Sequence, residues 1–129
     1  MTLVMLAAFA ACGDSDTTSP SASLAGTYNL SLVNGAALPF LVQASNPKIE
    51  LVAEQLVVNS AGTFTIATTR RNTPTTGSAT TTTTNGGGTY STSGGVTTFH
   101  FDGGNTGTAT LSANALTIAT TTGSSVYVR

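Results

Sequence analysis

The sequence predicts an all-β domain, an antiparallel up-and-down meander that closes into a small barrel of about eight strands. Three observations support this class. Apolar and polar residues alternate with a period of two through most of the chain after residue 23, tight-turn dipeptides separate the alternating runs, and no stretch has helical periodicity. Threonine, with 27 of the 129 residues, adds to the β preference because its branched side chain loses rotamer freedom in a helix.

Composition and charge narrow the classes of function. Charged residues make up 7% of the chain, and the formal net charge is −1. Four basic residues are too few to neutralise a phosphate backbone, so we expect no nucleic-acid partner. A hydrophobic content of 40% excludes a wholly disordered chain, and 129 residues allow one folded domain.

The N-terminus has the features of a secretion signal. An apolar run, residues 3–11, is shorter than the roughly 20 residues that span a bilayer but suits the core of a signal peptide. The run ends at Cys12, the only cysteine of the chain. The tetrapeptide Phe9-Ala10-Ala11-Cys12 resembles the lipobox of bacterial lipoproteins.

The lipobox resemblance implies that residues 1–11 are a lipoprotein signal peptide and that Cys12 becomes a lipidated N-terminus anchored in the membrane of the cell envelope. Several acyl chains, at about 0.8 kcal/mol per buried CH₂, would make this anchor effectively permanent. Gly13, where an aspartate would signal inner-membrane retention, implies the outer membrane if the host has two membranes. The alternative is ordinary cleavage after Ala8-Phe9-Ala10, which would leave a secreted or periplasmic protein with a free thiol.

A tether and the first hairpin follow. Residues 12–23 contain no large apolar side chain after the cysteine and are expected to form a flexible tether to a β-barrel domain at residues 24–129. The first strand is expected at residues 26–32, followed by the hairpin turn Asn34-Gly35, since both of these residues tolerate positive φ. A short second strand is expected at residues 38–42, where a proline confines the strand to an edge or lies at its start.

The most apolar run, residues 49–58, does not keep a single phase. Its second half fits the core face of a hairpin with the next strand. Carried backwards, the same phase would put Glu50 and Glu54 inside, so we expect a β-bulge near residues 53–55 that leaves both glutamates in solvent. One helical turn across residues 50–56 is the alternative.

The middle of the chain is of low complexity. Beyond a strand at residues 64–69, residues 73–88 are rich in threonine and glycine and are expected to form a long mobile loop, in which only residues 80–84 could pair as an edge strand. Further strands are expected at residues 88–92, 96–101, 106–111, 116–120 and 126–129.

Several short segments with hairpin-like sequence resemble parts of the lipocalin-like domains of bacterial envelope lipoproteins. They are Ala25 to Leu30, Val33 to Pro39, Ala61 to Ile66 and Gly88 to Tyr90. Tyr28 stands where lipocalins carry a tryptophan, and Arg129 ends the last strand, where a lipocalin arginine closes the barrel floor. The resemblance implies a barrel that holds a small apolar or amphipathic ligand.

No constellation of residues predicts catalysis, a metal or a cofactor. His100, the only histidine, alternates with Phe99 and Phe101 and should face solvent; Asp102 shares its face without a nucleophile in reach. Cysteine and histidine spacing supports no zinc site. We therefore expect a non-enzymatic protein.

Two small charged groups leave alternatives open. Glu50 and Glu54, about 13 Å apart at strand spacing, are too distant for a glycosidase pair and are interpreted as solvated. Arg70-Arg71 could dock a carboxylate or phosphate, or could simply solubilise the end of a strand.

The inward-facing apolar set is the candidate lining of a ligand cavity, although the same side chains could fill the barrel. Its members are Tyr28, Leu30, Leu32, Leu56, Val58, Phe64, Ile66, Phe99, Phe101, Leu116 and Ile118. If the barrel is filled, the alternative function is a protein-interaction module, an inhibitor or accessory subunit of an envelope complex, that uses the loop at residues 73–88 or the strand edge near Pro39.

Overall fold

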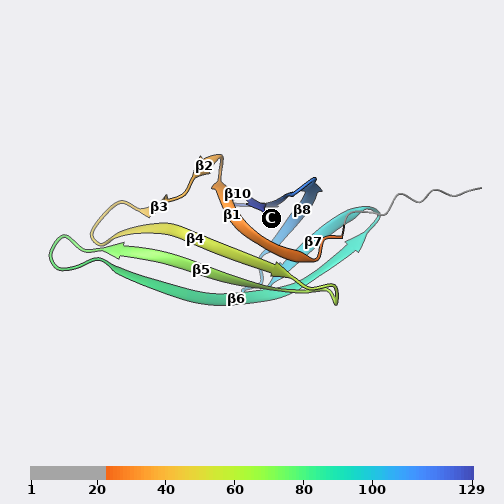
Figure 1. Ribbon diagram of the computed structural model, residues 1–129, viewed down its shortest axis with the longest axis horizontal. Coiled ribbons are helices and arrows are strands. Elements are labelled where there is room, and N and C mark those ends of the chain that lie inside the picture. Colours follow the sequence, from red (N-terminus) through yellow and green to blue (C-terminus); the bar gives the residue numbers. More distant parts are fainter. Residues whose placement is uncertain (1–22) are drawn as a thin grey trace, which may run out of the picture.

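The computed structural model describes residues 23–129; the expected signal peptide, Cys12 and all but the last residue of the expected tether lie outside these residues. The described chain forms a single sheet of ten strands (Figure 1). The strands are β1 (Gly26–Val33), β2 (Ala36–Ala37), β3 (Phe40–Gln43), β4 (Lys48–Val58), β5 (Thr63–Thr73), β6 (Thr80–Ser93), β7 (Val96–Phe101), β8 (Thr106–Ser112), β9 (Ala115–Thr120) and β10 (Gly123–Val128).

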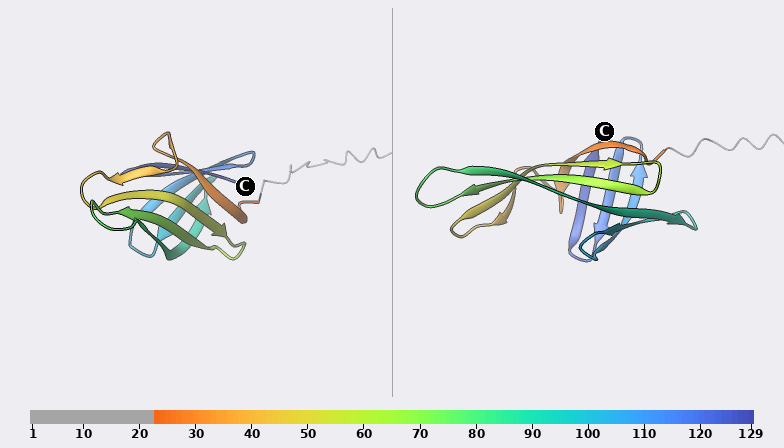
Figure 2. Two further views of the ribbon diagram at one scale, coloured as in Figure 1. Left: turned by 60° about the vertical axis from the view of Figure 1, so that its left-hand side comes forward. Right: turned by 90° about the horizontal axis from the view of Figure 1, so that it is seen from below.

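The sheet closes on itself into a barrel. β4 to β10 follow one another as antiparallel neighbours, and β1 pairs with both β10 and β4, so eight strands form the ring (Figure 2). Closure satisfies the backbone groups that the two outermost strands of an open meander would leave unpaired. The predicted class, an all-β meander in a closed barrel, is confirmed.

The seam between β1 and β4 opens at one end. β1 pairs with β4 only through Gly26–Asn29, which lie opposite Gln55–Val58. Further along, β1 pairs with the two-residue β2, and the start of β4 pairs with β3. The two short strands therefore continue the sheet where the two barrel strands separate (Figure 1).

The low-complexity segment is mostly strand. The edge strand that the sequence allowed at residues 80–84 is present, and the expectation of a loop is wrong for residues 85–87. β6 begins at Thr80 and pairs with β5 over ten consecutive residue pairs, from Asn72↔Thr80 to Thr63↔Thr89. The register comes from β5, a well-defined neighbour, rather than from the threonines themselves. Thr69 and Thr83 add a cross-strand hydroxyl contact of 2.9 Å. β4, β5 and β6 thus extend together beyond the shorter strands of the barrel (Figure 2).

The predicted tight turns are present. Asn34 and Gly35 have φ of 51° and 80°, and Gly94 and Gly95 have φ of 57° and 80°, which are the paired positive values that two-residue hairpins require. The Asn34 side chain also accepts a hydrogen bond of 2.8 Å from the backbone N–H of Ser124. This first turn is therefore attached to the start of β10.

One half of the barrel lumen is packed solid, and we call it the closed half. Aromatic rings fill its centre: Phe64 lies 4.8 Å from Phe99, and Tyr90 stacks on Phe99 at 5.5 Å between centroids. The Arg129 guanidinium lies 5.3 Å from the centre of the Tyr28 ring and covers this end. The buried side chains of the closed half are Tyr28, Leu56, Val58, Phe64, Phe99 and Leu116. Residues 23–129 contain every barrel strand and this core, so we expect them to fold without the preceding residues.

Candidate functional site

A β-bulge in β4 determines what enters the other half of the lumen. The register with β5 shifts between Leu51 and Ala53, so Val52 is the extra residue. Sequence reasoning expected the bulge a few residues later, which would have turned Glu54 to solvent. With the bulge before it, Glu54 keeps the inward phase of Leu56 and Val58. The solvated interpretation of Glu54 is therefore wrong, and its carboxylate lies in the lumen.

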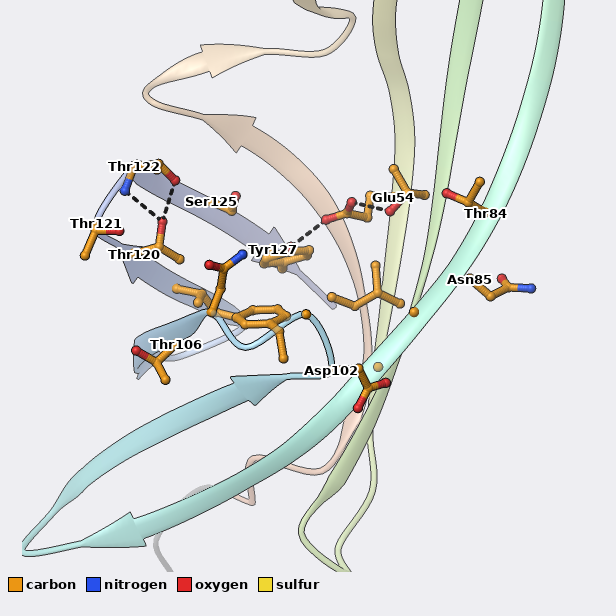
Figure 3. A pocket seen from close by; sticks show the side chains of 18 of the residues that line it. Glu54, Thr84, Asn85, Asp102, Thr106, Thr120, Thr121, Thr122, Ser125 and Tyr127 are labelled. Carbon is orange, nitrogen blue, oxygen red and sulfur yellow. Dashed lines mark hydrogen bonds between the residues drawn. The ribbon is translucent and has the colours of Figure 1, made fainter.

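The half of the lumen next to Glu54 is not filled, and we call it the open half. It holds a cavity of about 490 Å³. Ile66, Phe101 and Ile118 supply apolar wall, and Figure 3 shows the polar side chains around them. The polar lining is Glu54, Thr68, Arg70, Thr84, Asn85, Asp102, Asn105, Thr106, Thr120, Thr121, Thr122, Ser125 and Tyr127, together with Gly86, Gly87 and Gly103.

Glu54 is held by two hydroxyl groups. Tyr127 Oη donates to Glu54 Oε1 and Thr68 Oγ1 donates to Glu54 Oε2, each over 2.6 Å (Figure 3). Burial, together with the charge of Glu54, raises the pKa of the Tyr127 phenol well above its usual value. Tyr127 therefore stays a protonated donor, and the carboxylate is oriented by β5 on one side and β10 on the other.

Glycines make room on the β6 side of the cavity. A Cβ built on Gly86 would have no atom within 4 Å, whereas one built on Gly87 would come 2.6 Å from the carbonyl oxygen of Phe64. Gly86 faces Ile66 across the β5–β6 pair, so its missing side chain enlarges the open half.

The predicted apolar set divides between the two halves. Ile66, Phe101 and Ile118 line the cavity. Leu30 is buried and borders a second hollow at the β1–β4 seam, which Glu54 also lines. Leu32 is only half-buried, beyond a register shift in β1. The remaining members, Tyr28, Leu56, Val58, Phe64, Phe99 and Leu116, pack the closed half.

The other charged candidates lie outside the open half or at its rim. His100 is exposed on the outer face, as its alternation predicted. Glu50 is only 8% exposed, so the solvated interpretation is wrong for this glutamate as well. Its charge is paired with Lys48 at 2.8 Å and with Arg71 at 2.7 Å. Hydrogen bonds from Lys48 and then Arg71 hold the pKa of the Glu50 carboxyl below its usual value. The arginine pair is thus split: Arg71 neutralises Glu50, and Arg70 lines the cavity.

Sequence reasoning missed the polar half of the cavity. The alternation of Ser125 and Tyr127 with valines was a visible signal that β10 has an inner face with hydroxyl groups. Thr68 and Thr120 gave no separate signal, since threonine also covers the outside of this barrel.

Within residues 23–129, no helix has the length and apolar character needed to cross a membrane. The same residues contain no cluster of three or more His, Cys, Asp or Glu side chains placed to hold a metal ion. In comparisons with known proteins, no family model, no curated protein and no solved structure matches this chain.

Proposed function

We propose that this protein is a non-enzymatic binding protein that holds one small amphipathic molecule in the open half of its barrel. The observation that carries the proposal is the cavity of about 490 Å³ beside a closed aromatic core. Ligand sites commonly enclose about 300–1,000 Å³ and combine apolar walls with a few polar groups. Ile66, Phe101 and Ile118 would take the apolar part of the ligand, and Glu54 with the surrounding hydroxyls would take the polar part.

We also propose a location in the cell envelope. The lipobox around Cys12 supports a lipid-anchored protein of the cell envelope, in the outer membrane if the host has two membranes, with a secreted or periplasmic protein as the alternative. Three features support a lipocalin-like domain. They are the hairpin-like sequence segments, the eight-stranded ring, and the position of Arg129 over Tyr28 at the closed end.

The ligand proposal is tested by native mass spectrometry. Residues 23–129 are incubated with a lipid and metabolite extract of the host envelope, and we expect a discrete added mass at a one-to-one ratio. The variant Gly86→Phe should lose this mass, because Gly86 lines the cavity and an added Cβ there meets no atom within 4 Å, which leaves the ring free to occupy the space. Thr108→Phe, on the exposed outer face of β8, is the matched control and should keep it. An added mass that both variants retain would place the ligand elsewhere.

The anchor is tested separately by fractionation and palmitate labelling of the full chain. Cys12→Ala should move the protein from the membrane pellet to the soluble fraction and abolish labelling. An unchanged distribution would contradict lipidation at Cys12.

A protein-interaction module remains the second candidate function, and one observation favours it. Leu41 and Val42 on the edge strand β3 are large apolar side chains exposed to 48% and 52%. A partner docking there would lose affinity with Val42→Lys, whereas ligand binding in the lumen would not change. If mass spectrometry detects no bound ligand with any extract, the protein-interaction module becomes the preferred function.

A further inference from the structure

The carboxylate of Glu54 is half-buried in the lumen and forms no salt bridge among the described residues, although charges withdrawn from water are normally paired. Its two protein contacts are the neutral hydroxyls of Thr68 and Tyr127. Within the described part of the chain, both salt bridges belong to Glu50 and none reaches Glu54. Glu50 therefore serves as an internal comparison: two glutamates of one strand lie on opposite faces, and only the outer one is neutralised by this chain.

The carboxylate also has bonding capacity left. Two carboxylate oxygens offer about four lone-pair positions, and the two hydroxyls use two of them. Both hydroxyls are neutral donors, so they orient the Glu54 carboxylate without supplying a positive charge. A donor entering the cavity can bind the remaining positions, and a cationic donor gains most because charge-assisted hydrogen bonds are about twice as strong as neutral ones.

The cavity lining as a whole carries more negative than positive charge. Among the described residues it contains two carboxylates, Glu54 and Asp102, and one guanidinium, Arg70, which leaves a net charge of −1. Asp102 and Arg70 are exposed, whereas Glu54 is half-buried and is bound by Tyr127. Ile66 and Ile118 supply apolar wall to the same cavity. A low-polarity surrounding strengthens the attraction between a carboxylate and an entering cation.

Building on the proposed function, we infer that the open half selects amphipathic molecules with a protonated amino group, which Glu54 binds while the apolar part lies against Ile66, Phe101 and Ile118. The inference concerns the charge of the ligand. The proposed function requires only that a ligand occupies the cavity.

Three probes of matched size distinguish the inference about ligand charge from the proposed function. Octylamine, which is protonated at pH 7, octanol and octanoate share one alkyl chain and differ in the head group. Calorimetric titration of residues 23–129 should give octylamine at least about tenfold tighter binding than octanol, as expected for one added charged hydrogen bond, with octanoate weakest.

Variants then assign the selectivity to Glu54. Glu54→Gln should weaken octylamine about tenfold and leave octanol unchanged, whereas Glu50→Gln removes the same charge from the outer face and should change neither. If Glu54→Gln does not fold, Arg70→Gln serves instead: it removes the competing cation from the rim and should tighten octylamine binding.

The outcomes are distinct. Equal affinity for all three probes, or tighter binding of octanoate, overturns the inference, and loss of that binding in Gly86→Phe would still support the proposed function. An octylamine preference that survives Glu54→Gln also overturns the inference. Failure of octylamine to bind overturns the inference as well, and the proposed function is then decided by the envelope extract.

Discussion

The hydrogen bond from Tyr127 to Glu54 should contribute to the stability of the barrel, because it joins residues 73 positions apart across the lumen. Tyr127→Phe removes only the hydroxyl from a side chain that is 4% exposed, so the ring packing is kept. Hydrogen bonds to charged groups contribute about 1.5–3 kcal/mol. Glu54 keeps the bond from Thr68 and faces a cavity that water can enter, so we expect the lower end, about 1.5 kcal/mol.

The assay is a double-mutant cycle. Urea unfolding followed by circular dichroism is measured for the unaltered residues 23–129, Tyr127→Phe, Glu54→Leu and the double variant. A coupling free energy of about 1–2 kcal/mol is expected, with a fall in Tm of about 6 °C for Tyr127→Phe alone. Free energies that add to within about 0.3 kcal/mol would show that the two side chains do not interact, and would refute the orientation proposed for Glu54.

Three further predictions concern the packing of the closed half, the stability of the fold at acid pH and two glycines of β6. Phe99→Ala empties the centre of the aromatic cluster and should lower the free energy of unfolding by about 3–5 kcal/mol in urea titrations; a loss below about 1 kcal/mol would contradict a tightly packed closed half. The Glu50 pKa is lowered in the folded protein, so its ion pairs stabilise the fold above about pH 4.5 and are lost as the pH falls through the lower folded value. The stability difference between the unaltered protein and Glu50→Gln should therefore be largest near pH 7 and shrink at pH 3, and an unchanged difference would exclude this linkage. Gly88→Ala should destabilise by about 1–3 kcal/mol because its Cβ would run into the carbonyl oxygen of His100 and come 2.9 Å from the Phe64 ring, whereas Gly86→Ala should change stability by less than about 0.5 kcal/mol; equal effects in thermal melts would contradict the packing of β6.

The sequence predicts the strands and turns of this barrel because those features are local. Alternation assigns Tyr28 and Leu30 to the inside of β1, and the Asn34-Gly35 dipeptide determines the following turn. The closed half is predictable for the same reason, since large apolar side chains at alternate positions have no other place to pack.

The open half depends on non-local pairing and was not predictable in detail. The bulge at Val52 is located by two neighbours at once, since Leu51 lies opposite both Phe40 and Arg70. Moving it by two residues would turn Glu54 outward and remove the polar centre of the site. The start of β6 likewise takes its register from β5, which the polythreonine run itself does not specify.

Isoleucine methyl NMR can locate a ligand in the open half of the barrel, because the chain has three isoleucines and the barrel separates them. Ile66 and Ile118 line the cavity, whereas Ile49 lies near the start of β4 and does not. Residues 23–129, labelled at the isoleucine δ1-methyl groups, are titrated with octylamine and then with octanol. We expect saturable shifts at Ile66 and Ile118, none at Ile49, and loss of both shifts in Gly86→Phe. Shifts confined to Ile49, or shifts at Ile66 and Ile118 that persist in Gly86→Phe, would contradict a ligand site in the open half of the barrel.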